Sequence, residues 1–130
     1  MRRMASAAAV LVLGAGMAAA DPAEGLWKTE PGESGGYLHV ALYSCGSSIC
    51  GVIKQAFDGA GDLSDGYDHL GKRMIWDMTP IGGGVYESGR IWAPDRDKTY
   101  KSNMTLDGNR LEVEGCVLVI CRAQTWTRVR

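Results

Sequence analysis

The sequence predicts an all-β domain, a small eight-stranded antiparallel up-and-down barrel. Three observations predict it. Apolar and polar residues alternate over short segments, as in a strand with one buried face. Segments rich in Gly, Asp, Asn and Pro separate these strands at hairpin spacing. No long amphipathic helical pattern interrupts them. Eight short strands joined in this way are typical of an up-and-down barrel or a strongly curved sheet. A barrel of eight strands has an interior that is filled by side chains or holds one small ligand.

The first twenty residues are predicted to be a signal peptide that lies outside the fold. Arg2 and Arg3 precede an apolar run over residues 7–17, and three alanines at 18–20 form an A-x-A cleavage site before Asp21. The apolar run is short for a transmembrane helix, so no stable membrane anchor is expected. Cleavage would leave a barrel domain over residues 21–130, exported to the periplasm.

The charge of this domain narrows its partners. Removing Arg2 and Arg3 from the 14 basic residues leaves 12 against 15 acidic ones, a formal net charge of −3. No run of basic residues survives. Nucleic acid and anionic membrane surfaces are therefore poor candidate partners.

Alternation assigns a face to each strand in the first half of the chain. We expect a strand over residues 24–29 with Trp27 directed inward, followed by a Gly-rich loop at 31–36. Two further strands, at 37–43 and 49–57, then flank a turn at 46–48. Their expected inward residues are Leu38, Val40, Leu42, Ile49, Gly51, Ile53 and Phe57.

The second half is predicted in the same way. After an irregular segment at 58–71, the strand at 72–81 should place Met74, Trp76 and Met78 on one side. The strand at 85–92 has no clear inward face, because both parities mix apolar and polar residues. Residues 98–106, 110–115 and 122–129 complete the barrel, with turns at 82–84, 94–97 and 107–109.

Four cysteines in an exported chain predict two disulfides. They form two C-x4-C units, Cys45 to Cys50 and Cys116 to Cys121. A continuous strand over residues 110–129 would be about 66 Å long, too long for this domain, so the chain must turn near the second unit. This favours the local pairs Cys45–Cys50 and Cys116–Cys121. Crossed pairing between the units is the main alternative, and a four-cysteine zinc site is disfavoured by the oxidising compartment.

Several motifs together resemble one bacterial family, domain of unknown function 2147, whose fold is lipocalin-like. The resemblance covers essentially the whole mature chain. Its pieces are Ile49-Cys50-Gly51, the segments 71–78 and 89–100, and the stretch from Gly115-Cys116 to Trp126-Thr127-Arg128. It departs at residues 117–120, where a Gly-containing turn is expected. The resemblance implies a barrel in the cell envelope and no particular chemistry.

The segment Gly25-Leu26-Trp27 also looks like the Gly-x-Trp start of lipocalins. That resemblance implies barrel closure by an Arg of the last strand packed over the Trp of the first. Arg128 would then cover Trp27, and Trp126 would fill the adjacent layer. A guanidinium over an indole is favourable by about 0.5–2 kcal/mol.

Function is the least determined property. No nucleophile motif surrounds His39 or His69, so we expect no catalytic residue and no enzyme activity. We also expect no cofactor and no metal site, and we read the acids of residues 58–68 as solvated. A small hydrophobic or amphipathic ligand is the favoured partner, and a packed barrel that binds another envelope protein is the alternative. Candidate lining residues for a ligand are Met74, Trp76, Met78, Tyr86, Trp92 and Tyr100.

Overall fold

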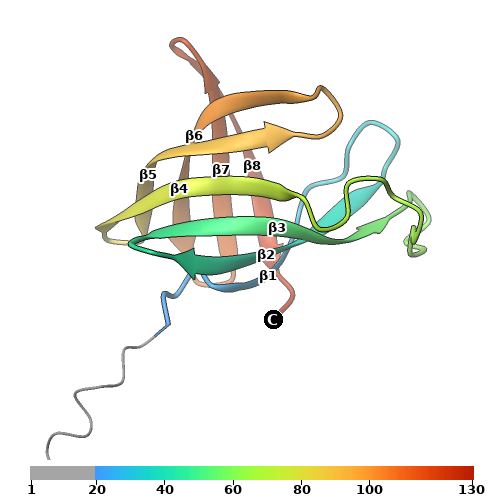
Figure 1. Ribbon diagram of the computed structural model, residues 1–130, viewed down its shortest axis with the longest axis horizontal. Helices are drawn as coiled ribbons and strands as arrows, with labels where there is room; N and C mark the ends of the chain where they lie inside the picture. The colour runs from blue at the N-terminus through green and yellow to red at the C-terminus, as the bar shows by residue number, and fades with distance from the viewer. Residues whose placement is uncertain (1–19) are drawn as a thin grey trace, which may run out of the picture.

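The computed structural model describes residues 20–130, and the predicted signal peptide falls almost entirely outside them. Eight antiparallel strands form one closed barrel in chain order, which confirms the predicted fold class (Figure 1). Among the described residues, no helix is long and apolar enough to cross a membrane. The strands are β1 (Gly25–Lys28), β2 (Tyr37–Cys45), β3 (Ser48–Phe57), β4 (Arg73–Gly82), β5 (Val85–Ala93), β6 (Lys98–Asp107), β7 (Arg110–Val117) and β8 (Ile120–Arg128).

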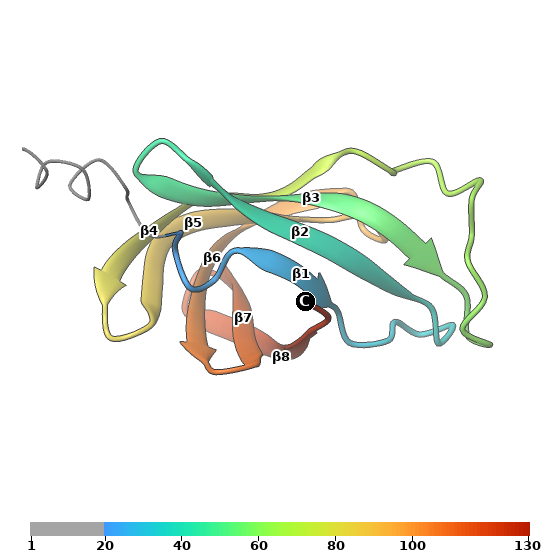
Figure 2. The same ribbon diagram turned by 90° about the horizontal axis from the view of Figure 1, so that it is seen from below.

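Up-and-down connectivity gives the barrel two different ends. The chain enters at one end, which also carries the short turns after β2, β4 and β6; we call it the closed end (Figure 2). The connections after β1, β3, β5 and β7 lie at the other, which we call the open end. The long connections, residues 29–36 and 58–72, are both at the open end, so that end is the more variable in shape.

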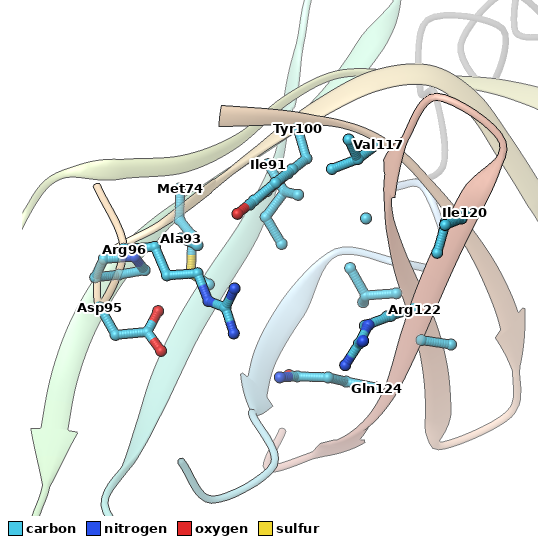
Figure 3. A pocket seen from close by; sticks show the side chains of 14 residues that line it. Met74, Ile91, Ala93, Asp95, Arg96, Tyr100, Val117, Ile120, Arg122 and Gln124 are labelled. Atoms are coloured by element: carbon cyan, nitrogen blue, oxygen red, sulfur yellow. The ribbon is translucent and has the colours of Figure 1, made fainter. Parts of the chain in front are cut away.

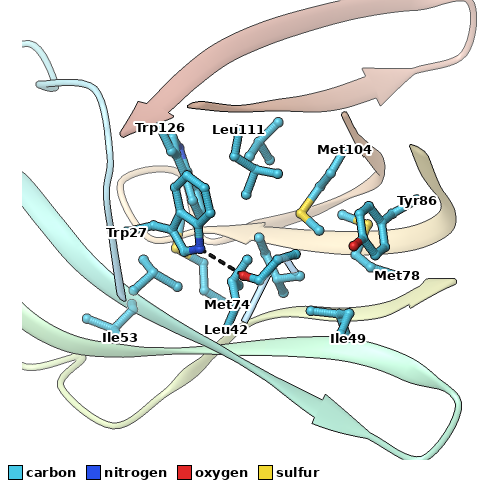
Figure 4. Close-up of a cluster of buried hydrophobic side chains, with 14 residues drawn as sticks. Trp27, Leu42, Ile49, Ile53, Met74, Met78, Tyr86, Met104, Leu111 and Trp126 are labelled. Carbon is cyan, nitrogen blue, oxygen red and sulfur yellow. Dashed lines mark hydrogen bonds between the residues drawn. The ribbon is translucent and has the colours of Figure 1, made fainter. Parts of the chain in front are cut away.

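The hydrophobic core lies inside the barrel and is formed by inward side chains of all eight strands together with Ala23 (Figure 4). Trp27 and Trp126 are fully buried and lie beside each other in the picture, with Leu111 and Met104 continuing the layer. Trp27 is paired directly with Arg128, and Leu111 with Trp126, so these residues share the inward parity of β1, β7 and β8. The first and last strands therefore meet as the sequence predicted.

A register shift in the second hairpin changes which residue near the end of β3 faces inward. The pairing of β2 with β3 shifts between His39 and Val40, where β3 carries one extra residue. An extra residue reverses the parity of everything that follows it. The prediction that Phe57 faces inward is wrong for this reason: Ala56 is buried instead, and Phe57 stacks on Tyr37 with ring centroids 4.9 Å apart.

Two further bulges lie in β4, and they change which of its side chains face inward. One lies at residues 73–75, where the pairing with β3 shifts, and another at Asp77, whose φ is 58°. Ile75 and Met78 are both fully buried, whereas Trp76 lies between them on the opposite parity, with Arg73 Cζ 4.5 Å from its ring centroid. The prediction that Trp76 shares a face with Met74 and Met78 is therefore wrong.

The partner strand β5 carries a matching irregularity. Ser88 has a φ of 63°, and the pairing with β6 shifts between Tyr86 and Gly89. This extra residue explains why neither parity of β5 is consistently apolar in the sequence. A β-carbon at Gly89 would overlap the side chain of Met78, so any larger residue here would force Met78 to move.

The cysteines form two local disulfides, each across the end of a hairpin. Cys45 and Cys50 join β2 to β3, with their Cα atoms 5.9 Å apart. Cys116 and Cys121 are direct partners in β7 and β8, with a Cα separation of 4.0 Å. The turn beyond the second pair is only Leu118-Val119, and Leu118 has a φ of 57°. A non-glycine residue in this left-handed region costs about 1–2 kcal/mol.

Candidate ligand-binding cavity

Arg128 seals the closed end of the barrel. Its Cζ lies 4.4 Å from the centroid of the Trp27 ring. The guanidinium donates to the carbonyl oxygens of Glu24 at 3.0 Å and Pro22 at 2.8 Å, and its Nε donates to Asn109 Oδ1 at 3.1 Å. One planar group thus joins the N-terminal segment to the turn after β6, because five donors in a fixed plane can reach several acceptors at once.

The residues before β1 complete this seal. Ala23 is fully buried, and its carbonyl accepts a hydrogen bond from Trp27 Nε1 at 2.9 Å. Asp21 accepts a hydrogen bond from the hydroxyl of Tyr86, at 2.5 Å. Burial and this hydrogen bond both raise the pKa of Tyr86, so the phenol stays protonated as a donor.

The open end contains a cavity of about 350 Å³ (Figure 3). This volume is at the lower limit of small-molecule pockets in proteins. The deeper wall is apolar and includes Met74, Ile91, Tyr100 and Val113. The rest of the lining is mixed: Asp95, Arg96, Arg122 and Gln124 are polar, and Val117 and Ile120, at the open end, are apolar. A molecule held here would have its apolar part inside and its polar part at the mouth.

The cavity exists because the inward residues of β7 become smaller toward the open end. They run from Leu111 through Val113 to Gly115. A β-carbon at Gly115 would lie 3.5 Å from Ile91 and 3.7 Å from Tyr100, which are ordinary contacts. A methyl group would thus fit at Gly115, and a larger side chain there would extend into the cavity that Gly115 lines.

The neighbouring strand β8 supplies the polar side of the same cavity. Gln124 is paired with Val113 and Arg122 with Gly115, so both share the inward parity of Trp126. Gln124 Oε1 accepts a hydrogen bond from Trp126 Nε1 at 2.9 Å. This bond satisfies the buried indole N–H and ties the cavity lining to the core beneath it.

The barrel wall is incomplete beside this cavity. Within residues 20–130, β1 pairs with β8 only at Trp27–Arg128 and Lys28–Thr127. The part of β8 nearer the open end has no strand on that side. Glu30 takes the place of one missing partner, because its Oε2 accepts a hydrogen bond from the Thr125 amide at 2.6 Å. The edge of β8 beside the cavity is therefore covered by a side chain at Thr125 and not by a strand.

The structure brings only part of the predicted ligand-binding set together. Met74 and Tyr100 line the cavity. Met78 and Tyr86 belong to the packed core near the closed end (Figure 4). Trp76 lies on the outer parity described above.

Trp92 is also outside the cavity. It is not among the residues that line the cavity, although its neighbours Ile91 and Ala93 are, and it packs at the edge of the core. Its ring is 5.0 Å from that of His69, and its Nε1 donates to Asp97 at 2.9 Å. The prediction that Trp76, Met78, Tyr86 and Trp92 form a ligand wall is corrected accordingly.

The sequence reasoning missed the polar residues of the mouth, although one signal for them was present. Once Trp126 is placed inward, Gln124 and Arg122 share its parity by simple alternation. Two polar residues on an inward parity indicate either a strand end or a hydrated cavity. Asp95 and Arg96 carry no such signal, because a Pro-Asp turn is expected to be polar in any case.

Other candidate chemistry in the described residues has structural explanations. Glu114, Cys116 and Cys121 place ligand atoms within 4.8 Å of one another, but both sulfurs belong to the disulfide. In the acidic segment, Asp58 Oδ1 accepts hydrogen bonds from the amides of Ala60 and Asp62, each at 2.9 Å. That carboxylate shapes its own turn.

Comparison with known proteins gives a family and a fold. The family model described as "Uncharacterized protein conserved in bacteria (DUF2147)" matches residues 25–128. Among solved structures, protein HP1028 from Helicobacter pylori, which belongs to the lipocalin family, is similar with a TM-score of 0.65. It shares 16% sequence identity, and the similarity covers 82% of each chain. None of the curated proteins matches the sequence.

Proposed function

The chain belongs to the DUF2147 family and folds as a lipocalin-like barrel, and from this premise we propose that it is an exported, non-enzymatic binding protein for a small amphipathic or hydrophobic molecule. The observation that carries the proposal is the cavity at the open end, with an apolar wall and a charged mouth. The closed end is sealed by Arg128 and Trp27, so a ligand would enter at the open end.

The charges of the mouth favour one kind of amphipathic ligand. The charged side chains among the cavity-lining residues are Arg96, Arg122 and Asp95, which leaves one positive charge in excess. Arginine binds carboxylate and phosphate groups through two parallel hydrogen bonds. A ligand with an apolar body and an anionic or polar end therefore fits best, its body against Ile91 and Tyr100.

Export to the periplasm is the second part of the proposal. Two disulfides indicate an oxidising, non-cytoplasmic compartment. The first residue after the predicted cleavage point already takes part in the fold, because Asp21 accepts hydrogen bonds from Tyr86 and from the Ala23 amide. Cleavage before Asp21 would keep both contacts. Intact mass measurement of protein from a periplasmic extract should give a chain that begins at Asp21, and an uncleaved mass in that extract would contradict the proposal.

Ligand binding is tested with the neutral apolar fluorophore N-phenyl-1-naphthylamine and the processed protein. Filling the cavity with Gly115→Leu should reduce probe affinity at least tenfold. Gly66→Leu is the matched control, because Gly66 has open space around it in the loop after β3. Equal probe binding by the wild type and both variants would refute binding in this cavity.

Native mass spectrometry of the protein purified from its own periplasm tests for a natural ligand. We expect a bound small molecule that is absent from Gly115→Leu. A wild-type protein that is consistently empty and does not bind the probe would favour the alternative, an envelope protein whose barrel serves as a scaffold for protein contacts.

A further inference from the structure

The β7–β8 hairpin exposes an apolar tip of four consecutive residues, Val117-Leu118-Val119-Ile120. Leu118 and Val119 are 92% and 94% exposed, so neither is packed against the barrel. In Figure 1 this hairpin projects beyond the other strands at the open end. Isolated apolar side chains are common on protein surfaces, but a contiguous apolar tip at the end of a projection indicates a contact surface.

The turn at this tip lacks the residues that hairpin turns favour, both for backbone conformation and for exposure to water. A two-residue hairpin turn favours Asn, Asp or Gly, which adopt a positive φ easily and are compatible with water. This chain has Leu118 at a φ of 57°, followed by Val119. The adjacent Cys116–Cys121 disulfide holds the two strands together and keeps the turn closed. Leu118 and Val119 pack against nothing in the barrel, so packing within the described residues does not explain why these two positions are apolar.

Basic residues gather around the apolar tip. A groove beside it is bordered by Cys116, Val117 and Leu118, and its charged side chains are Arg90, Arg96, Lys98 and Lys101, with no acidic residue among them. Arg122 follows the tip on β8. Five of the 12 basic residues of the domain are thus at this site, although the domain as a whole has a net charge of −3.

One acid lies beside this cluster: the carboxylate of Glu114 is within 4.8 Å of the Cys116 sulfur at the border of the groove, and it offsets one of the five positive charges. Two other acids have partners elsewhere. Asp97 accepts a hydrogen bond from Trp92 Nε1, and Asp95 lies near Tyr67, whose pKa its charge helps to raise. The acidic segment 58–68 is at the far side of the open end in Figure 1. Charges separated by more than a Debye length, about 8–10 Å at physiological salt, are largely screened from each other. A local basic surface can therefore attract an anionic partner despite the net negative charge.

We propose that the apolar tip and the basic groove dock the barrel reversibly onto an anionic lipid membrane. Leu118 and Val119 enter the boundary between headgroups and acyl chains, and the groove binds lipid phosphates. The combination of exposed aliphatic side chains with surrounding Lys and Arg matches this environment, in which each part is favourable. Val117 and Ile120 also line the cavity, so docking would place the cavity mouth at the lipid surface. The proposal stands without any ligand in the cavity.

Flotation of the processed protein with lipid vesicles tests the proposal. We expect binding to vesicles of phosphatidylethanolamine and phosphatidylglycerol at low salt, and at least tenfold weaker binding to pure phosphatidylcholine. Leu118→Ser/Val119→Ser should reduce the partition coefficient about tenfold or more, since two aliphatic side chains leave the lipid. Ile81→Ser is the matched control, because Ile81 is 58% exposed at the closed end.

The electrostatic part is tested separately. Lys98→Gln and Lys101→Gln should each weaken binding about fivefold, and added salt should remove this difference. Lys54→Gln, on the exposed face of β3, should have no effect. N-phenyl-1-naphthylamine binding should be unchanged in the tip variant, which keeps this test independent of the cavity.

Two results would overturn the proposal. One is equal flotation of the wild type and the tip variant. The other is a tip-dependent dimer in sedimentation velocity without vesicle binding, which would identify a second copy of the chain as the occupant.

Discussion

Replacing Arg128 with Ala tests whether one side chain closes the barrel. The substitution removes the contact with the Trp27 ring, worth about 0.5–2 kcal/mol. It also removes three hydrogen bonds of 3.1 Å or less, to Glu24, Pro22 and Asn109. Each such bond contributes about 0.5–1.5 kcal/mol net. Because Arg128 is half-buried and water would reach the freed acceptors, we expect a total loss of about 2–3 kcal/mol in the free energy of unfolding.

The assay is equilibrium urea unfolding of the oxidised protein followed by tryptophan fluorescence. Arg130→Ala is the matched control, since it changes the same charge two residues further along and should alter stability by less than about 0.5 kcal/mol. Arg128→Lys retains a cation but loses the planar donor set, so it should recover at most about 1 kcal/mol. If Arg128→Ala is as stable as Arg130→Ala, or if Lys restores full stability, the barrel is not closed in the way described.

Three further predictions concern the barrel itself. Gly89→Ala should lower the free energy of unfolding by about 1–3 kcal/mol, because Met78 occupies the position of the new methyl group. In urea unfolding, the double variant Gly89→Ala/Met78→Ala should lose less stability than the two single variants together. Simple additivity of the two losses would contradict the contact. Tyr86→Phe should cost about 1 kcal/mol at neutral pH by loss of the bond to Asp21. Folding raises the pKa of Tyr86 above 10.0, so the stabilisation that depends on the protonated phenol is complete below pH 10.0 and is lost as the pH rises toward the folded-state pKa. In urea unfolding at alkaline pH, the stability of the wild type should therefore fall more steeply than that of Tyr86→Phe. Parallel profiles for the two proteins would argue against the buried phenol. Cys116→Ser/Cys121→Ser should lose about 2 kcal/mol, the value for a loop of this length, in thermal or urea unfolding; an unchanged stability would mean that the hairpin is equally restricted without the bond.

Local patterns were sufficient to predict the strands and their order. The observed bounds differ from the predicted ones by no more than two residues at any strand end, because alternation and turn chemistry are properties of neighbouring residues. The meeting of Trp27 with Arg128 was implied by the resemblance of Gly25-Leu26-Trp27 to the start of lipocalins, and the structure confirms it. The sequence favoured local disulfides over crossed ones, and the structure has the local pairs.

The bulges were not predictable from these patterns. Asp77 and Ser88 adopt a positive φ within strands, and nothing in their immediate sequence distinguishes them from ordinary polar positions. Each extra residue reverses the face of the residues that follow, which is why Phe57 and Trp76 were assigned to the wrong side. A bulge depends on the partner strand and on the curvature of the barrel, and both are tertiary properties.

The sequence by itself indicated the strands and their order and favoured local cysteine pairs, because these follow from short-range periodicity and chain length. Closure of the barrel by Trp27 and Arg128 was implied by the resemblance to lipocalins. Only the tertiary structure decided where the barrel is filled and where it is open. Gly115 becomes a cavity wall only opposite Ile91 and Tyr100, which come from two other strands. Likewise, five basic residues scattered over residues 90–122 become one charged site beside Leu118 only when β5, β6, β7 and β8 are brought together. Distances across a sheet are set by pairing and not by separation along the chain, so composition and net charge could not reveal either feature.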